Sequence, residues 1–124
     1  MSGGSLPGEL GAELVREVEI ALGAREDVVI YRNPVLVARA PSGRPILTGI
    51  GGEGAPDLHV EVRVGTRWVC LWLECKAGSG VLNPKQRQWH KAALARGRHV
   101  VTVRSVADAE QAIRELQEGV PWAP

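Results

Sequence analysis

The stretch "DLHVEVRVGTRWVCLWLECK", Asp57 to Lys76, decides the fold of this chain. Its two runs of strand-forming residues flank Gly65 and Thr66, a spacing that is typical of a β-hairpin with a two-residue turn. With these two residues at the centre, the apolar side chains of the two strands match one another, beginning with Leu58 opposite Leu73. A shift by one residue would turn apolar side chains toward the wrong face, so the pattern predicts a single register.

The same register places two carboxylates, those of Asp57 and Glu74, opposite each other at one end of the hairpin. Directly opposed residues have Cβ atoms about 4.5–5.5 Å apart, and like charges at that distance repel. Lys76 follows Glu74 by two residues and therefore emerges on the same face. One interpretation is a surface ion triad, but surface ion pairs stabilise a protein by at most about 1 kcal/mol. The other is a site for Mg²⁺ or Mn²⁺, which bind carboxylate oxygens, and the clustering of charged groups favours it.

Helix, strand and turn signals continue on both sides of this hairpin. We expect a helix over 9–22 that Gly23 ends, strands over 27–32 and 35–40, a turn over 41–45, a helix that Asn83 caps and Gly97 ends, a strand over 99–104, and a last helix after Ser105 whose Ala109, Ala112, Ile113 and Leu116 face the core. This order, α-β-(β)-β-β-α-β-α, predicts the α/β (α+β) class, with a mixed sheet that contains a central hairpin and is flanked by helices.

Length and composition set further limits. The 124 residues suit one domain over 9–120, with a flexible N-terminus over 1–8 and a C-terminal tail over 121–124. No run of about 18 apolar residues predicts a membrane span, and the first residues lack the basic and apolar regions of a signal peptide. We therefore expect a cytoplasmic protein without a membrane partner.

Charge is distributed unevenly, although the formal net charge is only +1. The segment from Cys75 to Ala107 contains seven bases and no acid, and the acids gather in residues 9–19 and 108–118. Such a basic segment is either a solvated face or a surface for the phosphates of a nucleic acid. Charge alone leaves both interpretations open.

Three motifs that follow one another in the chain resemble those of a known nuclease family. They are Gly54-x-Pro56-Asp57, Glu74-x-Lys76 and the helix start Asn83-Pro-x-x-Gln86. The likeness is to the VRR-NUC domain, in its small stand-alone phage or bacterial form, of the PD-(D/E)xK nuclease superfamily. It runs continuously from residue 54 to about residue 106, and residues 14–33 resemble the N-terminal helix and first strand of that family.

The resemblance implies a restriction-endonuclease-like core and an endonuclease that uses Mg²⁺ or Mn²⁺, and no organic cofactor, to hydrolyse DNA phosphodiester bonds. Branched or junction-like DNA is the expected partner, in repair or recombination in a bacterial or phage-infected cell, and the chain is expected to form a homodimer. Asp57, Glu74 and the backbone carbonyl of Cys75 would bind the metal. Lys76 would position or help activate the attacking water, and Gln86 would lie beside the site, unless its role is only to cap the helix together with Asn83.

The chain departs from the family pattern in the first helix, where Gly11 stands at the position of a usual glutamate. Glu9, Glu13 and Glu17 surround this position. Glu13 and Glu17 lie one turn apart on one face, so either could reach the site if the helix shifts or rotates. We select Glu13 as the catalytic candidate; the alternative is a solvated acidic stripe.

Five residues are candidates for DNA contact: Arg32, Asn33, Lys85, Arg87 and Lys91. The alternative for the first two is an ordinary exit from a strand into a turn. The other three lie on the acid-poor helix, where cations would hold phosphates and so position DNA without reading its sequence.

Two functions of other classes compete with the nuclease. One is a catalytically silent DNA-binding module, which the glycine at position 11 favours, and the other is a structural or interaction domain.

Overall fold

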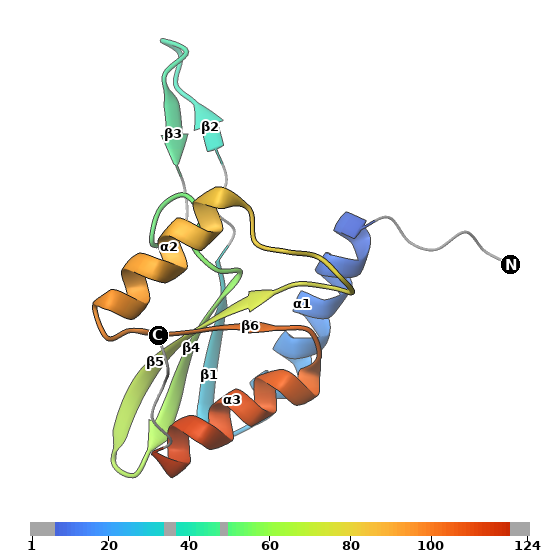
Figure 1. The fold of residues 1–124 in the computed structure, drawn as a ribbon, viewed down its shortest axis with the longest axis vertical. Coiled ribbons are helices and arrows are strands. Elements are labelled where there is room, and N and C mark those ends of the chain that lie inside the picture. The colour runs from blue at the N-terminus through green and yellow to red at the C-terminus, as the bar shows by residue number, and fades with distance from the viewer. Residues whose placement is uncertain (1–6, 34–36, 48–49, 120–124) are drawn as a thin grey trace, which may run out of the picture.

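The computed structural model of the chain describes residues 7–33, 37–47 and 50–119 (Figure 1). Its elements are α1 (Pro7–Gly23), β1 (Val28–Arg32), β2 (Val37–Arg39), β3 (Pro45–Leu47), β4 (Leu58–Val64), β5 (Arg67–Cys75), α2 (Pro84–Ala95), β6 (His99–Val103) and α3 (Val106–Glu118). The elements that the sequence predicts are present in the predicted order, and the structure contains one further strand, β3, after β2. It pairs with β2 in a separate two-stranded sheet that projects from the rest of the chain (Figure 1).

The four strands β1-β4-β5-β6, in that spatial order, form the main sheet. Both β1 and β5 run antiparallel to β4, whereas β6 runs parallel to β5, so the sheet is mixed as predicted. Leu58 pairs with Leu73 and Val64 with Arg67, which is the register that the apolar pattern of the hairpin predicts. The hairpin turn therefore consists of the two residues expected for it, Gly65 and Thr66.

The two faces of this sheet have different cover. The face packed against α1 and α3 holds the main core, which includes Val60, Leu71 and Leu73, all fully buried. The last helix contributes the four residues predicted for it, Ala109, Ala112, Ile113 and Leu116. On the other face, α2 packs against Trp72 and Val100 through Ala93 and Trp89. Figure 1 shows the strands of the sheet between α2 and the pair α1 and α3.

Caps set the ends of α2 as the sequence predicts. The Asn83 side chain accepts a hydrogen bond from the Gln86 N–H, and the Gln86 Oε1 accepts one from the Asn83 N–H, both at 2.9 Å. These bonds satisfy two N–H groups that have no partner within the helix. At the other end, Gly97 takes a φ of +77° after the C-cap Arg96. The start of α2, which carries Gln86, is thereby fixed.

None of the described helices is long and apolar enough to cross a membrane.

Candidate metal centre

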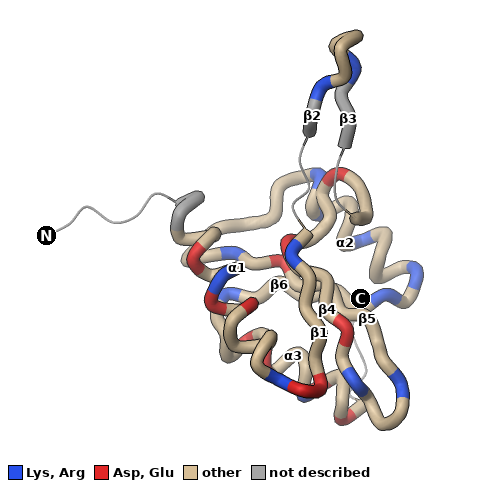
Figure 2. The backbone as a smooth tube through the Cα atoms, turned by 180° about the vertical axis from the view of Figure 1, so that it is seen from behind, with Lys and Arg blue, Asp and Glu red and all other residues tan. Residues whose placement is uncertain are grey.

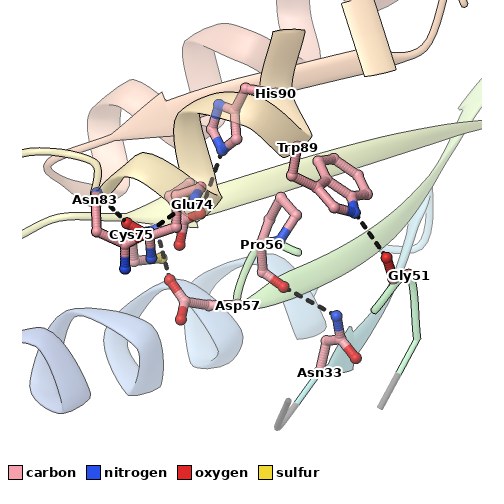
Figure 3. Close-up of polar contacts among 10 residues, drawn as sticks. Asn33, Gly51, Pro56, Asp57, Glu74, Cys75, Asn83, Trp89 and His90 are labelled. Carbon is pink, nitrogen blue, oxygen red and sulfur yellow. Dashed lines mark hydrogen bonds and ion pairs between the residues drawn. The ribbon is translucent and has the colours of Figure 1, made fainter. Parts of the chain in front are cut away.

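Four residues in or directly next to neighbouring strands form a row at one end of the main sheet: Thr102, Glu74, Asp57 and Asn33. Glu74 pairs with Thr102 across the parallel strands β5 and β6. Asp57 precedes β4 by one residue, opposite Glu74 in the register of the hairpin. The Asn33 N–H donates to the Asp57 carbonyl at 2.7 Å and so continues the row beyond β1. The structure thus brings Asp57 and Glu74 close together, as the sequence predicts, with Glu74 beneath α2 and Asp57 on the side of α1 (Figure 3).

Glu74 is a buried carboxyl group. Only 1% of its surface is exposed, because it lies at the end of an almost continuously buried strand and beneath α2. Burial is the main reason why its pKa is raised from 4.5 to about 7; hydrogen bonding to His90 opposes this, and the hydrogen bond and charge of Asp57 reinforce it. Near neutral pH, the protein therefore ionises this group only against the cost of burial and the repulsion of a second carboxylate.

Asp57 is held in place by backbone groups around it. Its Oδ2 accepts a hydrogen bond from the Cys75 N–H at 2.9 Å, which draws the carboxylate toward β5 (Figure 3). Asn33 supports the preceding residue, since its Nδ2 donates to the Pro56 carbonyl at 3.0 Å. The same Nδ2 donates to the Ile50 carbonyl at 2.8 Å, and Oδ1 accepts from the Ile50 N–H at 2.7 Å. Asn33 is 5% exposed, and its described contacts are structural; a contact with DNA stays a prediction.

Lys76 lies next to this row. Its N–H donates to the Val103 carbonyl at 3.0 Å, so the pairing of β5 with β6 continues past Glu74. Alternation along the strand then places Lys76 on the same face as Glu74. Its side chain is half-buried and runs past Gly80. The approach of its ammonium group to the two carboxylates, which the Glu-x-Lys spacing implies, stays a prediction.

His90 is a component of the site that the sequence did not reveal. Its Nε2 lies 3.2 Å from the Glu74 Oε1, and the residue is 8% exposed (Figure 3). His90 follows Gln86 by one helical turn, so both face the same side of α2. That spacing was the available signal, but its use requires knowing which face of α2 meets the sheet.

No carboxylate of the first helix is among the described residues that line the hollow beside Asp57. This hollow, of about 170 Å³, is lined by Ala12, Val15, Arg32, Asn33 and Asp57. Glu19 of α1 lies nearby, since it pairs with Arg32 and its charge affects the Cys75 thiol. Glu13 and Glu17 are exposed on other sides of α1, and the Glu9 side chain lies outside the described part of the chain. The catalytic role of Glu13 therefore stays a prediction that these positions do not support. Arg32, a candidate for DNA contact, forms an ion pair with Glu19.

The basic residues of α2 are exposed, as a surface for phosphates requires. Lys85, Arg87 and Lys91 are all exposed. The α2 tube carries basic positions and no acidic one (Figure 2). The Lys85 Nζ lies 3.8 Å from the Glu53 Oε2, and the Arg87 Nη1 donates to the Leu82 carbonyl at 2.8 Å. Trp89 is used for packing, because its Nε1 donates to the Gly51 carbonyl at 2.8 Å and its ring meets Trp72 edge to face.

The donors of the site suit a hard divalent cation. Mg²⁺ is commonly held by one or two carboxylates together with water and substrate phosphates, and Asp57 and Glu74 supply two. Burial, with Asp57 and Glu74 nearby, raises the pKa of the Cys75 thiol to about 12, so this residue offers only its backbone carbonyl. Among the described residues, no three His, Cys, Asp or Glu side chains are grouped to hold a metal. Two carboxylates are compatible with Mg²⁺ or Mn²⁺, whose remaining ligands can be water and phosphate.

Comparisons with protein families, with curated proteins and with solved structures found no match for this chain. The interpretation of the site therefore depends on its geometry and on the resemblance of its motifs. Both point to Asp57 and Glu74, and the motif adds Lys76. Two roles were considered for Gln86, a helix cap and a place beside the site, and the structure shows the cap. Its Oε1 caps α2, and a contribution of its amide nitrogen to the site stays a prediction.

Proposed function

We propose that this protein is an endonuclease that uses Mg²⁺ or Mn²⁺ to hydrolyse DNA phosphodiester bonds. One observation carries the proposal: a buried glutamate, with its pKa raised to about 7, faces a second carboxylate at a sheet end where a lysine also emerges. A fold selected only for stability would avoid this arrangement, because it buries one acid next to another. A restriction-endonuclease-like core, a branched DNA substrate and a homodimer belong to the same proposal and follow from the motif resemblance.

The chain's own residues have separate parts in such a reaction. Asp57, Glu74 and the Cys75 carbonyl would hold the cation. A cation bound there would lower the pKa of a water molecule and offset the negative charge that develops on the phosphate. The Lys76 ammonium would donate hydrogen bonds to the attacking water or to a phosphate oxygen and so align the two. His90 keeps the Glu74 carboxylate in one orientation from the side of α2.

The competing function is a silent DNA-binding module on the same fold. The observation in its favour is the hollow next to Asp57, where the described lining residues from α1 are Ala12 and Val15 and the nearby Glu19 is paired with Arg32. If a third acidic ligand is essential, then the two carboxylates would bind a cation too weakly for turnover. Such a module would retain DNA affinity through the basic residues of α2.

A cleavage assay separates the two functions. We expect the purified protein to cut branched DNA with Mn²⁺ and not with chelator, and we expect Lys76→Ala to lower the rate by about a hundredfold or more, as the loss of a group that stabilises the transition state does. Arg67→Ala, an exposed cation at the opposite end of the hairpin, is the matched control and should cut at the wild-type rate. Cutting that survives in Lys76→Ala would mean that a contaminant or another site is responsible. DNA binding without any cutting would favour the silent module.

A pair of variants at His90 tests the support of Glu74. His90→Leu should weaken Mn²⁺ binding by about tenfold, as loss of a hydrogen bond to a metal-binding carboxylate does. His90→Gln should restore most of that affinity, because its amide nitrogen can donate to Glu74 Oε1 from nearly the same place. Titration calorimetry with Mn²⁺ provides the measurement. Equal affinities in the two variants would show that the histidine only fills space.

A further inference from the structure

A second hollow lies next to the candidate metal centre, on the β6 side. Its volume is about 460 Å³, and its lining residues are Val81, Leu82, Arg87, Thr102, Arg104 and Asp108. Two of these six residues are arginines, and a third offers a hydroxyl group. The function proposed above assigns no part to Thr102 or Arg104. The hollow is therefore the strongest remaining candidate for a binding site.

The sheet register fixes its position relative to the metal centre. Thr102 is the cross-strand partner of Glu74, and the next residue on the same face of β6 is Arg104. Because the Lys76 N–H bonds to the Val103 carbonyl, Lys76 and Arg104 lie side by side directly after the ends of β5 and β6. Neighbouring strands are about 4.8 Å apart. The hollow thus begins one strand away from the carboxylates.

Both arginines are held by the same short segment of chain. Arg87 donates through Nη1 to the Leu82 carbonyl at 2.8 Å, and Arg104 donates through Nη1 to the Gly78 carbonyl at 2.9 Å. A guanidinium group has five N–H donors, so each keeps further donors for a ligand. Anchoring of one nitrogen reduces the entropy lost when the others bind, and a planar guanidinium suits phosphate oxygens.

The charge of the hollow is positive. Neither Arg87 nor Arg104 forms an ion pair with another side chain in the described ranges. The only lining acid is Asp108, and its Oδ2 accepts a hydrogen bond from the Arg104 backbone N–H at 2.9 Å. Its N–H in turn donates to the Ser105 hydroxyl at the start of α3. Asp108 therefore serves the helix start, and two arginines outweigh its charge.

We propose that Arg87, Thr102 and Arg104 bind one backbone phosphate of a nucleic acid, adjacent to the phosphate at the candidate metal centre. This inference rests on the proposed function for its substrate class. The two guanidinium groups and the Thr102 hydroxyl provide donors for the phosphate oxygens, and the hollow leaves room for the attached sugar. The contact fixes the position of the strand and carries no sequence information.

Binding measured without cleavage tests the inference. Fluorescence anisotropy with a labelled branched DNA, in chelator, gives Kd over a series of salt concentrations. We expect Arg87→Gln and Arg104→Gln to raise Kd by about tenfold each and to reduce the salt slope by about one phosphate contact. Thr102→Val, which preserves shape, should raise Kd by a smaller factor. Arg96→Gln, which removes an exposed cation at the far end of α2, is the matched control and should have a much smaller effect.

Single neutral methylphosphonate linkages in the same DNA identify the phosphate. One position should weaken wild-type binding and have no further effect in Arg104→Gln, because both changes remove the same contact. The inference is overturned if no position shows this dependence, or if both arginine variants bind as Arg96→Gln does. Failure of the nuclease proposal looks different: wild-type protein would not cut with Mn²⁺, while the arginine-dependent phosphate would still appear in the binding scan.

Discussion

Glu74→Gln should lower the rate of cleavage severely and at the same time make the protein more stable at pH 8. Glutamine keeps the shape of the side chain and its hydrogen-bonding partners, Asp57 and His90, but carries no charge. Loss of one of two metal-binding carboxylates should lower the cleavage rate by about a thousandfold, which corresponds to several kcal/mol of transition-state stabilisation. Removal of a buried charge should raise the free energy of unfolding at pH 8 by about 2 kcal/mol, or the melting temperature by roughly 8 °C.

The sign of the stability change follows from the raised pKa of Glu74. Between its ordinary value of 4.5 and about 7, the folded protein keeps a proton that the unfolded chain has released. The free energy of unfolding therefore falls as pH rises through this window. In Glu74→Gln that decline should disappear, so the two proteins should melt at similar temperatures at pH 5 and differ at pH 8.

Thermal melts at both pH values, with and without Mn²⁺, check this result. Mn²⁺ should raise the melting temperature of the wild type at pH 8 and have little effect on Glu74→Gln, since a ligand stabilises only the protein that binds it. Glu61→Gln, at a half-buried glutamate on the same face of the sheet, is the matched control and should show neither effect. A variant less stable than the wild type at pH 8 would show that the Glu74 charge stabilises the fold, and the argument for a cation site would be lost.

Gly54→Ala should destabilise the protein by about 3 kcal/mol or more. Gly54 has a φ of +88°, and an added Cβ would lie 2.5 Å from the Lys85 carbonyl oxygen and 2.7 Å from its carbon. These are backbone atoms in the first turn of α2, so relief of the clash would require the backbone of the helix or of the Gly54 loop to move. The cost combines the strain of a left-handed residue, about 1–3 kcal/mol, with that of an overpacked contact, about 1–3 kcal/mol. Separation of the loop from α2 would also move Asp57 away from Glu74.

Gly52→Ala provides the control for backbone strain alone. Gly52 has a similar φ of +80°, but a Cβ there would meet nothing within 4 Å. It should cost only about 1 kcal/mol in a urea titration. The difference between the two variants measures the close approach of the loop to α2. Equal losses would mean that this approach contributes nothing to stability.

The parts of the fold that were predictable from the sequence depend on local patterns. Alternation of apolar residues sets the β4–β5 register, because an error of one residue would expose the whole core face. The pairing of Asp57 with Glu74 follows directly from that register. The cap formed by Asn83 and Gln86 was also predictable, because it involves residues only three apart.

The parts that were not predictable depend on contacts between distant segments. Thr102 lies beside Glu74 because β6 pairs in parallel with β5 after a helical crossover, and no local pattern sets that register. His90 reaches Glu74 only because α2 lies on one particular face of the sheet with one particular rotation. Asn33 was considered for DNA contact because it matches a strand end of the resembled family. Its bonds to Ile50 and Pro56 were not predictable, because they join segments that the sequence does not relate.

The two hydrogen bonds between the Asn33 side chain and the Ile50 backbone indicate where this protein could be re-engineered. The side-chain amide of Asn33 donates to the Ile50 carbonyl and accepts from the Ile50 N–H, so it joins the two ends of the intervening segment. The same amide also donates to the Pro56 carbonyl. Lengthening a closed loop costs only about 0.6 kcal/mol for each doubling. A longer segment could therefore be inserted between Asn33 and Ile50 while the sheet end with Asp57 and Glu74 keeps its structure.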